Sequence, residues 1–404
     1  MVIATLVVGV GGGIAGAVVS LALHGIEHAA FGYNVGTFLD GVTHASPIQR
    51  VISLVVAGII GAVGWWALRR WGRPVVSVAD TVAGSRMPAV VTIANVGLQV
   101  VIVGLGASIG REVAPRELGA LIAGWVGARA RLSPRQRRML VACGAGSALA
   151  AVYNVPLGGA LFSIEVLLVE WSLDVVVVAV TTSVVATVVA WVVVPTSPLY
   201  RVPSVHLSGS LVVGAVVAGP FLGALATYFV KLIAFAGRHR PRSFGVLIAM
   251  PLIFAAVGGV SIWFPEILGN GRALGQTAFS DVPIVLIAIL AIAKTLATAG
   301  TIGSGAAGGT LTPALAVGAC LGAAFGGVWS MLWPGSPVVA FALVGAAAFL
   351  GTTLSAPITA MVLVLEFTQQ NTILLVPMMI ATIGAYAVGR LLTRRETARI
   401  TGIP

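Results

Sequence analysis

One acidic side chain stands out in a sequence that has very few. Glu112 lies in the segment Gly110–Pro115, which reads GREVAP, within a chain that is 58% hydrophobic and 9% charged. A soluble fold of 404 residues cannot bury that much apolar surface, so the composition predicts an integral membrane protein. An ionisable side chain at membrane depth is costly and typically marks a transport pathway. Glycine before it and proline after it also indicate a broken helix, which makes transport the leading functional class.

Two further segments share this Gly/Pro character. They are Gly84–Pro88 (GSRMP) and Gly308–Pro313 (GGTLTP). Proline is well tolerated at a helix start, and glycine lets backbone N–H groups approach a ligand closely. A helix N-terminus carries unpaired donors and a partial positive charge, so converging helix starts would bind an anion without a contacting Lys or Arg. The hydroxyl of Ser85 would add one neutral donor.

In this order, the three segments resemble the signature motifs GSGxP, GREGP and GxFxP of the CLC family of chloride channels and chloride/proton antiporters. The resemblance runs from about residue 50 to about residue 390. It implies an all-α integral membrane fold of two inverted-topology halves with broken, re-entrant helices, assembled as a homodimer with one pore per subunit. It also implies that Glu112 is the gate, and that the anion is bound by residues of the three motifs: Gly84, Ser85, Arg111, Val113, Thr310 and Leu311.

An internal repeat supports two halves. Residues 144–166 and 345–367 each carry Gly, then Pro twelve positions later, then Glu nine positions further on. Corresponding Gly/Pro-broken segments in two halves are typical of transporters built from repeats. We therefore expect one membrane transport domain, residues 1–404, with approximate halves 1–200 and 201–404.

The sequence also departs from the family pattern. Arg86 stands where the family usually has Gly, so it is a candidate vestibule charge that attracts anions, or else a side chain that reaches lipid headgroups. Pro115 falls one position late, and Leu311 replaces the usual Phe. The family's antiporters carry an internal glutamate where this chain has Val166, and their pore tyrosine aligns with Ala398. By this resemblance we expect a chain that is short for the family, without the usual N-terminal helix and without a cytoplasmic regulatory domain.

Other acids allow plainer interpretations. Glu112 could be a structural carboxylate paired with Arg111 or Arg116. Glu165 and Glu366 occupy matched positions of the repeat and are expected to be structural. Glu117 is expected to face an arginine and receives no role.

Composition limits the partners and the location. The net charge of +11 comes from basic residues in short loops between apolar stretches, which predicts a multi-pass protein of the plasma membrane with these loops in the cytoplasm, and no nucleic-acid partner. Lipid and a small anion such as chloride are the expected partners. Two isolated cysteines and five scattered histidines indicate no metal site, and no cofactor is expected. Because no nucleophile–base pairing is evident, we do not expect an enzyme.

The resulting prediction is chloride transport through a pathway gated by Glu112, channel-like or weakly coupled to protons. One alternative is a chloride/proton antiporter that uses a different internal acid. The others are a fluoride-selective carrier and an unrelated inverted-repeat secondary transporter.

Overall fold

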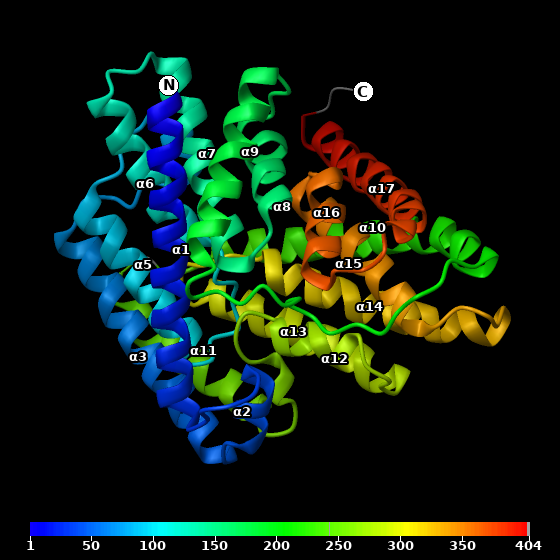
Figure 1. The fold of residues 1–404 in the computed structure, drawn as a ribbon. Coiled ribbons are helices and arrows are strands. Elements are labelled where there is room, and N and C mark those ends of the chain that lie inside the picture. The colour runs from blue at the N-terminus through cyan, green and yellow to red at the C-terminus, as the bar shows by residue number, and fades with distance from the viewer. Residues whose placement is uncertain (242, 402–404) are drawn as a thin grey trace. The chain divides into compact units, whose positions relative to one another are not determined.

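The computed structural model describes the backbone of residues 1–241 and 243–401 and the side chains through residue 394. This part of the chain is helical and contains no strand, so the predicted all-α class is confirmed (Figure 1). The α-helices are α1 (Val2–Phe31), α2 (Phe38–His44), α3 (Pro47–Trp71), α4 (Val78–Val82), α5 (Ala89–Gly104), α6 (Val113–Arg129), α7 (Pro134–Tyr153), α8 (Pro156–Leu161), α9 (Leu173–Ala190), α10 (Gly209–Arg238), α11 (Gly245–Val260), α12 (Arg272–Ala278), α13 (Ile284–Gly303), α14 (Leu311–Leu332), α15 (Val338–Leu354), α16 (Pro357–Thr368) and α17 (Leu375–Thr401). A π-helix covers Phe162–Leu168, and 3₁₀ turns cover Pro265–Ile267 and Thr372–Leu374.

Helix length and composition make this a multi-pass membrane protein, as predicted. Seven helical segments of the described chain are long and apolar enough to cross a bilayer: α1, α3, α9, α10, α13, α14 and the segment Thr372–Arg394. Shorter apolar helices such as α5, α15 and α16 accompany them.

Local sequence signals define several helix starts. Ser46 caps α3 by accepting a hydrogen bond from the Gln49 N–H, and Pro47 occupies the first helical position. Ser133 and Pro134 start α7 in the same way, with Gln136 completing a capping box.

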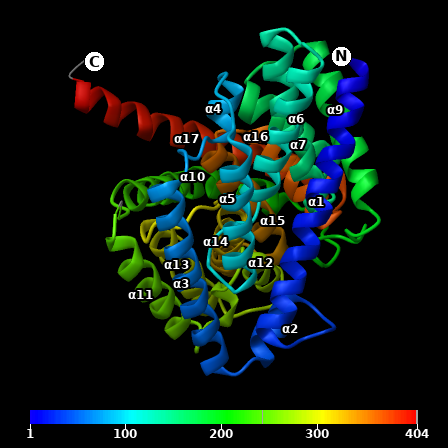
Figure 2. The same cartoon turned by 90° about the vertical axis from the view of Figure 1, so that its left-hand side faces the viewer.

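The chain forms two compact units, and neither is continuous in sequence. The first unit contains residues 1–197, 240–270 and 301–309. In it α1 packs against α7 and α9, α6 packs against α7, and α3 packs against α5 and α11. Figure 2 shows α4 beyond one end of α5, with α6 beside α5.

The second unit contains residues 198–239, 271–300 and the chain from 310 onward. In it α14 packs against α15, and α10 packs against α17. Segments 240–270 and 301–309 of the second half of the chain thus belong with the first unit. The single transport domain with halves 1–200 and 201–404 stays a prediction.

The internal repeat appears as two matched helix breaks. Helix α7 ends at Asn154 (φ 56°) and α15 at Ser355 (φ 55°), both in the left-handed conformation. Two residues later Pro156 begins α8 and Pro357 begins α16. Proline cannot continue a preceding helix but fits the first position of a new one, so it fixes the break at the same place in both copies.

The copies differ in the helix that follows the break. The first copy continues into the π-helix and ends at Val169 (φ 53°), whereas the second stays α-helical and ends at Gln369 (φ 48°). The first copy is one residue longer between its two left-handed residues, and the wider π-turn accommodates that residue.

Candidate functional site

The connection between α5 and α6 is held by a pair of glycines far apart in sequence. The Gly110 N–H donates to the Gly309 carbonyl at 2.7 Å, and the Gly309 N–H donates to the Gly110 carbonyl at 3.0 Å. These reciprocal bonds form an isolated antiparallel bridge within the first unit. The bridge joins Gly110 of the second Gly/Pro segment to Gly309 of the third, so these two glycines meet in space.

The Glu112 carboxyl lies directly on this bridge. Glu112 is fully buried, with 0% of its surface exposed. A Cβ added at either Gly110 or Gly309 would overlap the Glu112 carboxyl atoms. Both positions must therefore lack a side chain for the carboxyl to occupy this cradle of two glycines.

Glu112 also occupies the N-cap position of α6. The N–H groups of the first helical turn have no intrahelical acceptor and carry partial positive charge. Pro115, the third residue of α6, has no N–H to contribute. A carboxylate or another anion is stabilised at this end of the helix.

Two arginines flank Glu112 and rest on aromatic rings. The Arg111 guanidinium lies 4.8 Å from the centre of the Tyr153 ring, and the Arg116 guanidinium lies 4.9 Å from that of Phe162. The Arg116 Nε donates to the main-chain carbonyl of Glu112 at 2.9 Å. Arg116 therefore fixes the backbone at the start of α6.

A second carboxyl of α6 belongs to a buried polar cluster that the sequence did not reveal. The Asn95 amide donates to both Glu117 oxygens, at 3.1 and 2.8 Å, and the Gln99 amide donates to one of them at 3.2 Å. The Trp65 indole N–H donates to Asn95 Oδ1 at 2.9 Å, which orients the Asn95 amide. All four side chains are buried.

The available sequence signal for this cluster was the spacing of Asn95 and Gln99. They are separated by one helical turn within an otherwise apolar helix. Buried polar side chains require partners, and a carboxylate on a neighbouring helix satisfies both amides.

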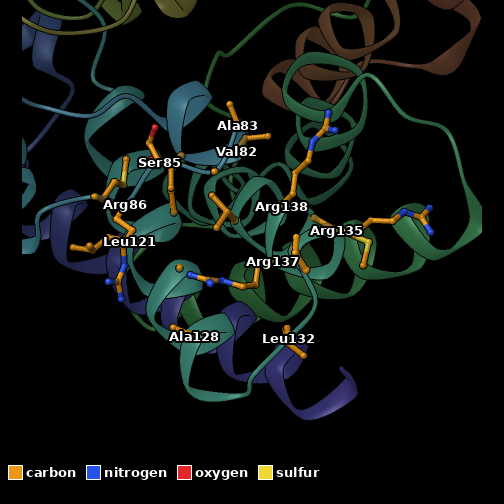
Figure 3. Close-up of a pocket in the computed structure, with 18 of the residues that line it drawn as sticks. Val82, Ala83, Ser85, Arg86, Leu121, Ala128, Leu132, Arg135, Arg137 and Arg138 are labelled. Carbon is orange, nitrogen blue, oxygen red and sulfur yellow. The ribbon is translucent and has the colours of Figure 1, made fainter.

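The first Gly/Pro segment lies elsewhere. Gly84, Ser85 and Arg86 are exposed and line a pocket with arginines of α7 (Figure 3). The start of α5 and the last part of α6 line this pocket, so the two helices run antiparallel and Glu112 lies at the other end of the pair. The bonds from Asn95 to Glu117 set the register of the helices. At 1.5 Å per residue, Pro88 and Glu112 are about 18 Å apart along the pair.

Thr310 and Leu311 start α14 as the sequence predicted. Thr310 is the N-cap, and Pro313 is the third helical residue, as Pro115 is in α6. Val166 is half-buried in the π-helix. Ala398 falls outside the residues whose side chains the structure describes.

Sequence comparison decides the family. The model of the family described as "Voltage gated chloride channel" matches residues 57–390, most of the chain. The chain belongs to the voltage-gated chloride channel, or CLC, family. This membership confirms the predicted resemblance and removes the unrelated inverted-repeat transporter as an alternative. CLC proteins are ion channels or transporters, so the chain is not an enzyme.

Named relatives of this CLC chain include both functional types. It is 29% identical over 407 residues to the "Voltage-gated ClC-type chloride channel ClcB" of Citrobacter koseri, with 96% of each sequence covered. It is 30% identical over 302 residues to the "H(+)/Cl(-) exchange transporter ClcA" of Vibrio cholerae, covering 72% of this chain and 64% of the relative.

Structural comparison gives the CLC fold. The solved structure of "a slow cyanobacterial Cl-/H+ antiporter" aligns with a TM-score of 0.82 at 20% identity, covering 96% of this chain and 94% of the other. At that identity the likeness shows the fold alone.

Proposed function

We propose that this chain carries chloride across the membrane and that Glu112 gates the pathway. The observation that carries the proposal is the fully buried Glu112 carboxyl at the N-cap of α6, seated on Gly110 and Gly309. A site built from helix N–H groups and bare glycine backbone suits a small anion, and the carboxylate has the charge of that anion. The names of the relatives support chloride as the anion.

The gating mechanism follows from like charges. An ionised Glu112 carboxylate and a chloride ion repel each other, so a carboxylate seated on the two glycines closes the site to the anion. Protonation removes the charge and lets chloride replace the carboxyl. The proposed anion donors are the N–H groups of residues adjacent to Glu112 or following Gly309: Arg111, Val113, Thr310 and Leu311.

Gly84 and Ser85 are not among the residues that we propose to bind the anion next to Glu112. Their predicted contact with the transported anion stays a prediction, and their position in the arginine-lined pocket makes them candidates for an outlying binding step. Replacing Ser85 by alanine would test that contact through chloride affinity.

The proposal is tested by neutralising the gate. Glu112→Gln keeps the size of the side chain and removes its charge. We expect chloride efflux from proteoliposomes to rise and to lose its dependence on pH, because glutamine carries no titratable charge. Glu366→Gln, at a matched position of the repeat and without a proposed role in transport, is the control and should behave as the native chain. A native flux and pH response in Glu112→Gln would reject the gate.

We propose weak proton coupling, because Val166 cannot carry a proton and Ala398 lacks the tyrosine hydroxyl. Because the internal glutamate of the antiporters is missing, protons reach Glu112 through water alone. The expected reversal potential then follows the chloride gradient.

A specific observation favours one second candidate, a chloride/proton antiporter. Glu117 is a buried acid about 1.4 helical turns from Glu112. Its amide partners Asn95 and Gln99 can accommodate either protonation state by rotating. In the described part of the chain the Gln99 Oε1 has no hydrogen-bond partner, and a flipped amide would place it to accept from a protonated Glu117.

Proton flux separates the two candidates. If an imposed chloride gradient drives protons uphill at a fixed ratio in the native chain, and Glu117→Gln abolishes this movement but keeps chloride flux, the antiporter is correct. If the native chain moves chloride without protons, the channel-like proposal is correct. Fluoride in place of chloride in the same assay tests the fluoride-selective alternative.

A further inference from the structure

A large basic pocket lies at the end of the α5–α6 pair opposite Glu112. Its volume is about 980 Å³. It is lined by α4, the turn before α5, the last part of α6 and the start of α7 (Figure 3). Four arginines line it, namely Arg86, Arg135, Arg137 and Arg138, and we call these residues the arginine pocket.

The arginines come from two elements and surround one space. Arg86 lies in the turn before α5, and the other three lie in the first turns of α7. In Figure 3 the Arg137 side chain extends across the pocket in the direction of Arg86, while Arg135 and Arg138 lie on the other side. The Arg137 stem lies close to Gly127 of α6, which supports that orientation.

The charge of the arginine pocket is only partly balanced by its one lining acid. Glu170 accepts a hydrogen bond from Arg135 at 2.7 Å, and Arg138 donates to the Leu168 carbonyl at 3.3 Å. Three arginines at the start of α7 also face the positive end of the helix dipole, which disfavours cations, and the first turn of α7 contains no acid. An anionic ligand would relieve both sources of repulsion.

An exposed tryptophan beside the pocket indicates the level of the membrane–water interface. Trp125 lines the pocket and is 61% exposed, and the Arg129 guanidinium lies 5.3 Å from the centre of its ring. Tryptophan is enriched at the membrane–water interface, and arginine-rich loops mark the cytoplasmic side. Both the headgroups of the inner leaflet and soluble cytoplasmic anions can reach this level.

Guanidinium chemistry selects the ligand class. Arginine presents a planar set of donors that matches the oxygens of a phosphate group in a bidentate manner. We propose that the arginine pocket is a phosphate-binding site, occupied by the phosphate of an anionic lipid headgroup or of a soluble phosphorylated compound. This inference is independent of the Glu112 gate.

The test uses the purified full-length chain with two probes. Sodium pyrophosphate binding is measured by calorimetry in detergent at constant ionic strength, with gluconate as the other anion. Lipid binding is measured as phosphatidylglycerol retained from mixed phosphatidylcholine–phosphatidylglycerol nanodiscs. Monodisperse gel filtration verifies that each variant is folded.

Three variants give distinct expectations. Arg137→Gln should weaken binding about tenfold, the equivalent of one charge-assisted hydrogen bond. Glu170→Gln should strengthen binding, because it releases Arg135 from its internal acid. Arg240→Gln, an exposed arginine in the loop after α10, is the matched control and should bind as the native chain does. If Arg137→Gln does not fold, Arg86→Gln in the exposed turn replaces it.

The pattern of losses identifies the source of the phosphate. A loss restricted to phosphatidylglycerol assigns the pocket to a lipid headgroup, and a loss restricted to pyrophosphate assigns it to a soluble ligand. A loss of both supports phosphate recognition without preference for the source. Absence of binding to either probe, or equal binding by the pocket variants and Arg240→Gln, overturns the proposal.

Discussion

At the scale of single residues, the two glycines under Glu112 determine where its carboxyl lies. Neither Gly110 nor Gly309 has a positive φ, so alanine fits the backbone at both positions. Alanine also keeps the N–H and carbonyl groups that form the bridge. A side chain introduced at either position would therefore act by occupying the space of the Glu112 carboxyl.

The first prediction concerns Gly309→Ala. The added methyl group would overlap the Glu112 carboxyl and displace it from the cradle. We expect higher chloride flux with weaker pH dependence, approaching that of Glu112→Gln. Efflux from proteoliposomes measures both.

Two further variants make this prediction specific. The double variant Glu112→Gln with Gly309→Ala should match the single Glu112→Gln variant, because both changes act on the same group. Gly97→Ala in α5 places its methyl group in open space and should leave flux unchanged. Additive effects in the double variant would show that the glycine acts elsewhere.

The sequence was sufficient to single out Glu112 as an acid at membrane depth, but it did not show which residues surround the carboxyl. A lone acid in an apolar chain stands out by composition. Its contact with Gly309 joins residues far apart in the chain, and no periodic pattern records such a contact. The same holds for Ser85. The motif predicted a hydroxyl donor at the anion site, but only the antiparallel register of α5 and α6 shows that Ser85 lies at the other end of this helix pair.

At the scale of elements, the two helix breaks of the repeat show which features can be predicted from local sequence. Both Pro residues could be aligned from the sequence, because proline punctuation is local, whereas the left-handed residues before them appear only in the structure. The π-helix at Phe162–Leu168 could not be predicted, since a gap-free comparison of the copies hides one extra residue.

The second prediction compares the two left-handed residues. Ser355 is exposed at φ 55°, a conformation that costs a non-glycine residue about 1–2 kcal/mol. Ser355→Gly should stabilise the protein by about 1 kcal/mol, allowing for the greater chain entropy of glycine. The midpoint of thermal unfolding in detergent should rise.

The matched change Asn154→Gly should have the opposite effect. Asn154 accepts a hydrogen bond from the Trp191 indole at 2.8 Å and donates to the Thr196 carbonyl at 3.4 Å. Losing two bonds of about 0.5–1.5 kcal/mol each outweighs the relief of backbone strain. A higher unfolding midpoint in Asn154→Gly would show that these bonds do not hold the first break.

At the scale of the whole molecule, the family resemblance implies a homodimer with a complete pathway in each subunit. Each copy of the 40.9 kDa chain has its own Glu112. In such a dimer, the independence of the two Glu112 gates can be tested.

The third prediction is that the two gates work independently. Dimers purified with one native and one Glu112→Gln subunit should show flux intermediate between the two parent dimers, about half of it pH-dependent. Light scattering in detergent should give the mass of two chains. A mixed dimer that behaves like either parent, or a monomeric mass, contradicts the prediction.

The bridge between Gly110 and Gly309 also bears on how the protein is made. The first unit takes in residues 240–270 and 301–309, so its cradle is incomplete until the ribosome has synthesised and released that late segment. Long-range contacts of this kind form late, after local helices have entered the membrane. A nascent chain interrupted before residue 309 therefore holds Glu112 without one of the two glycines on which its carboxyl rests.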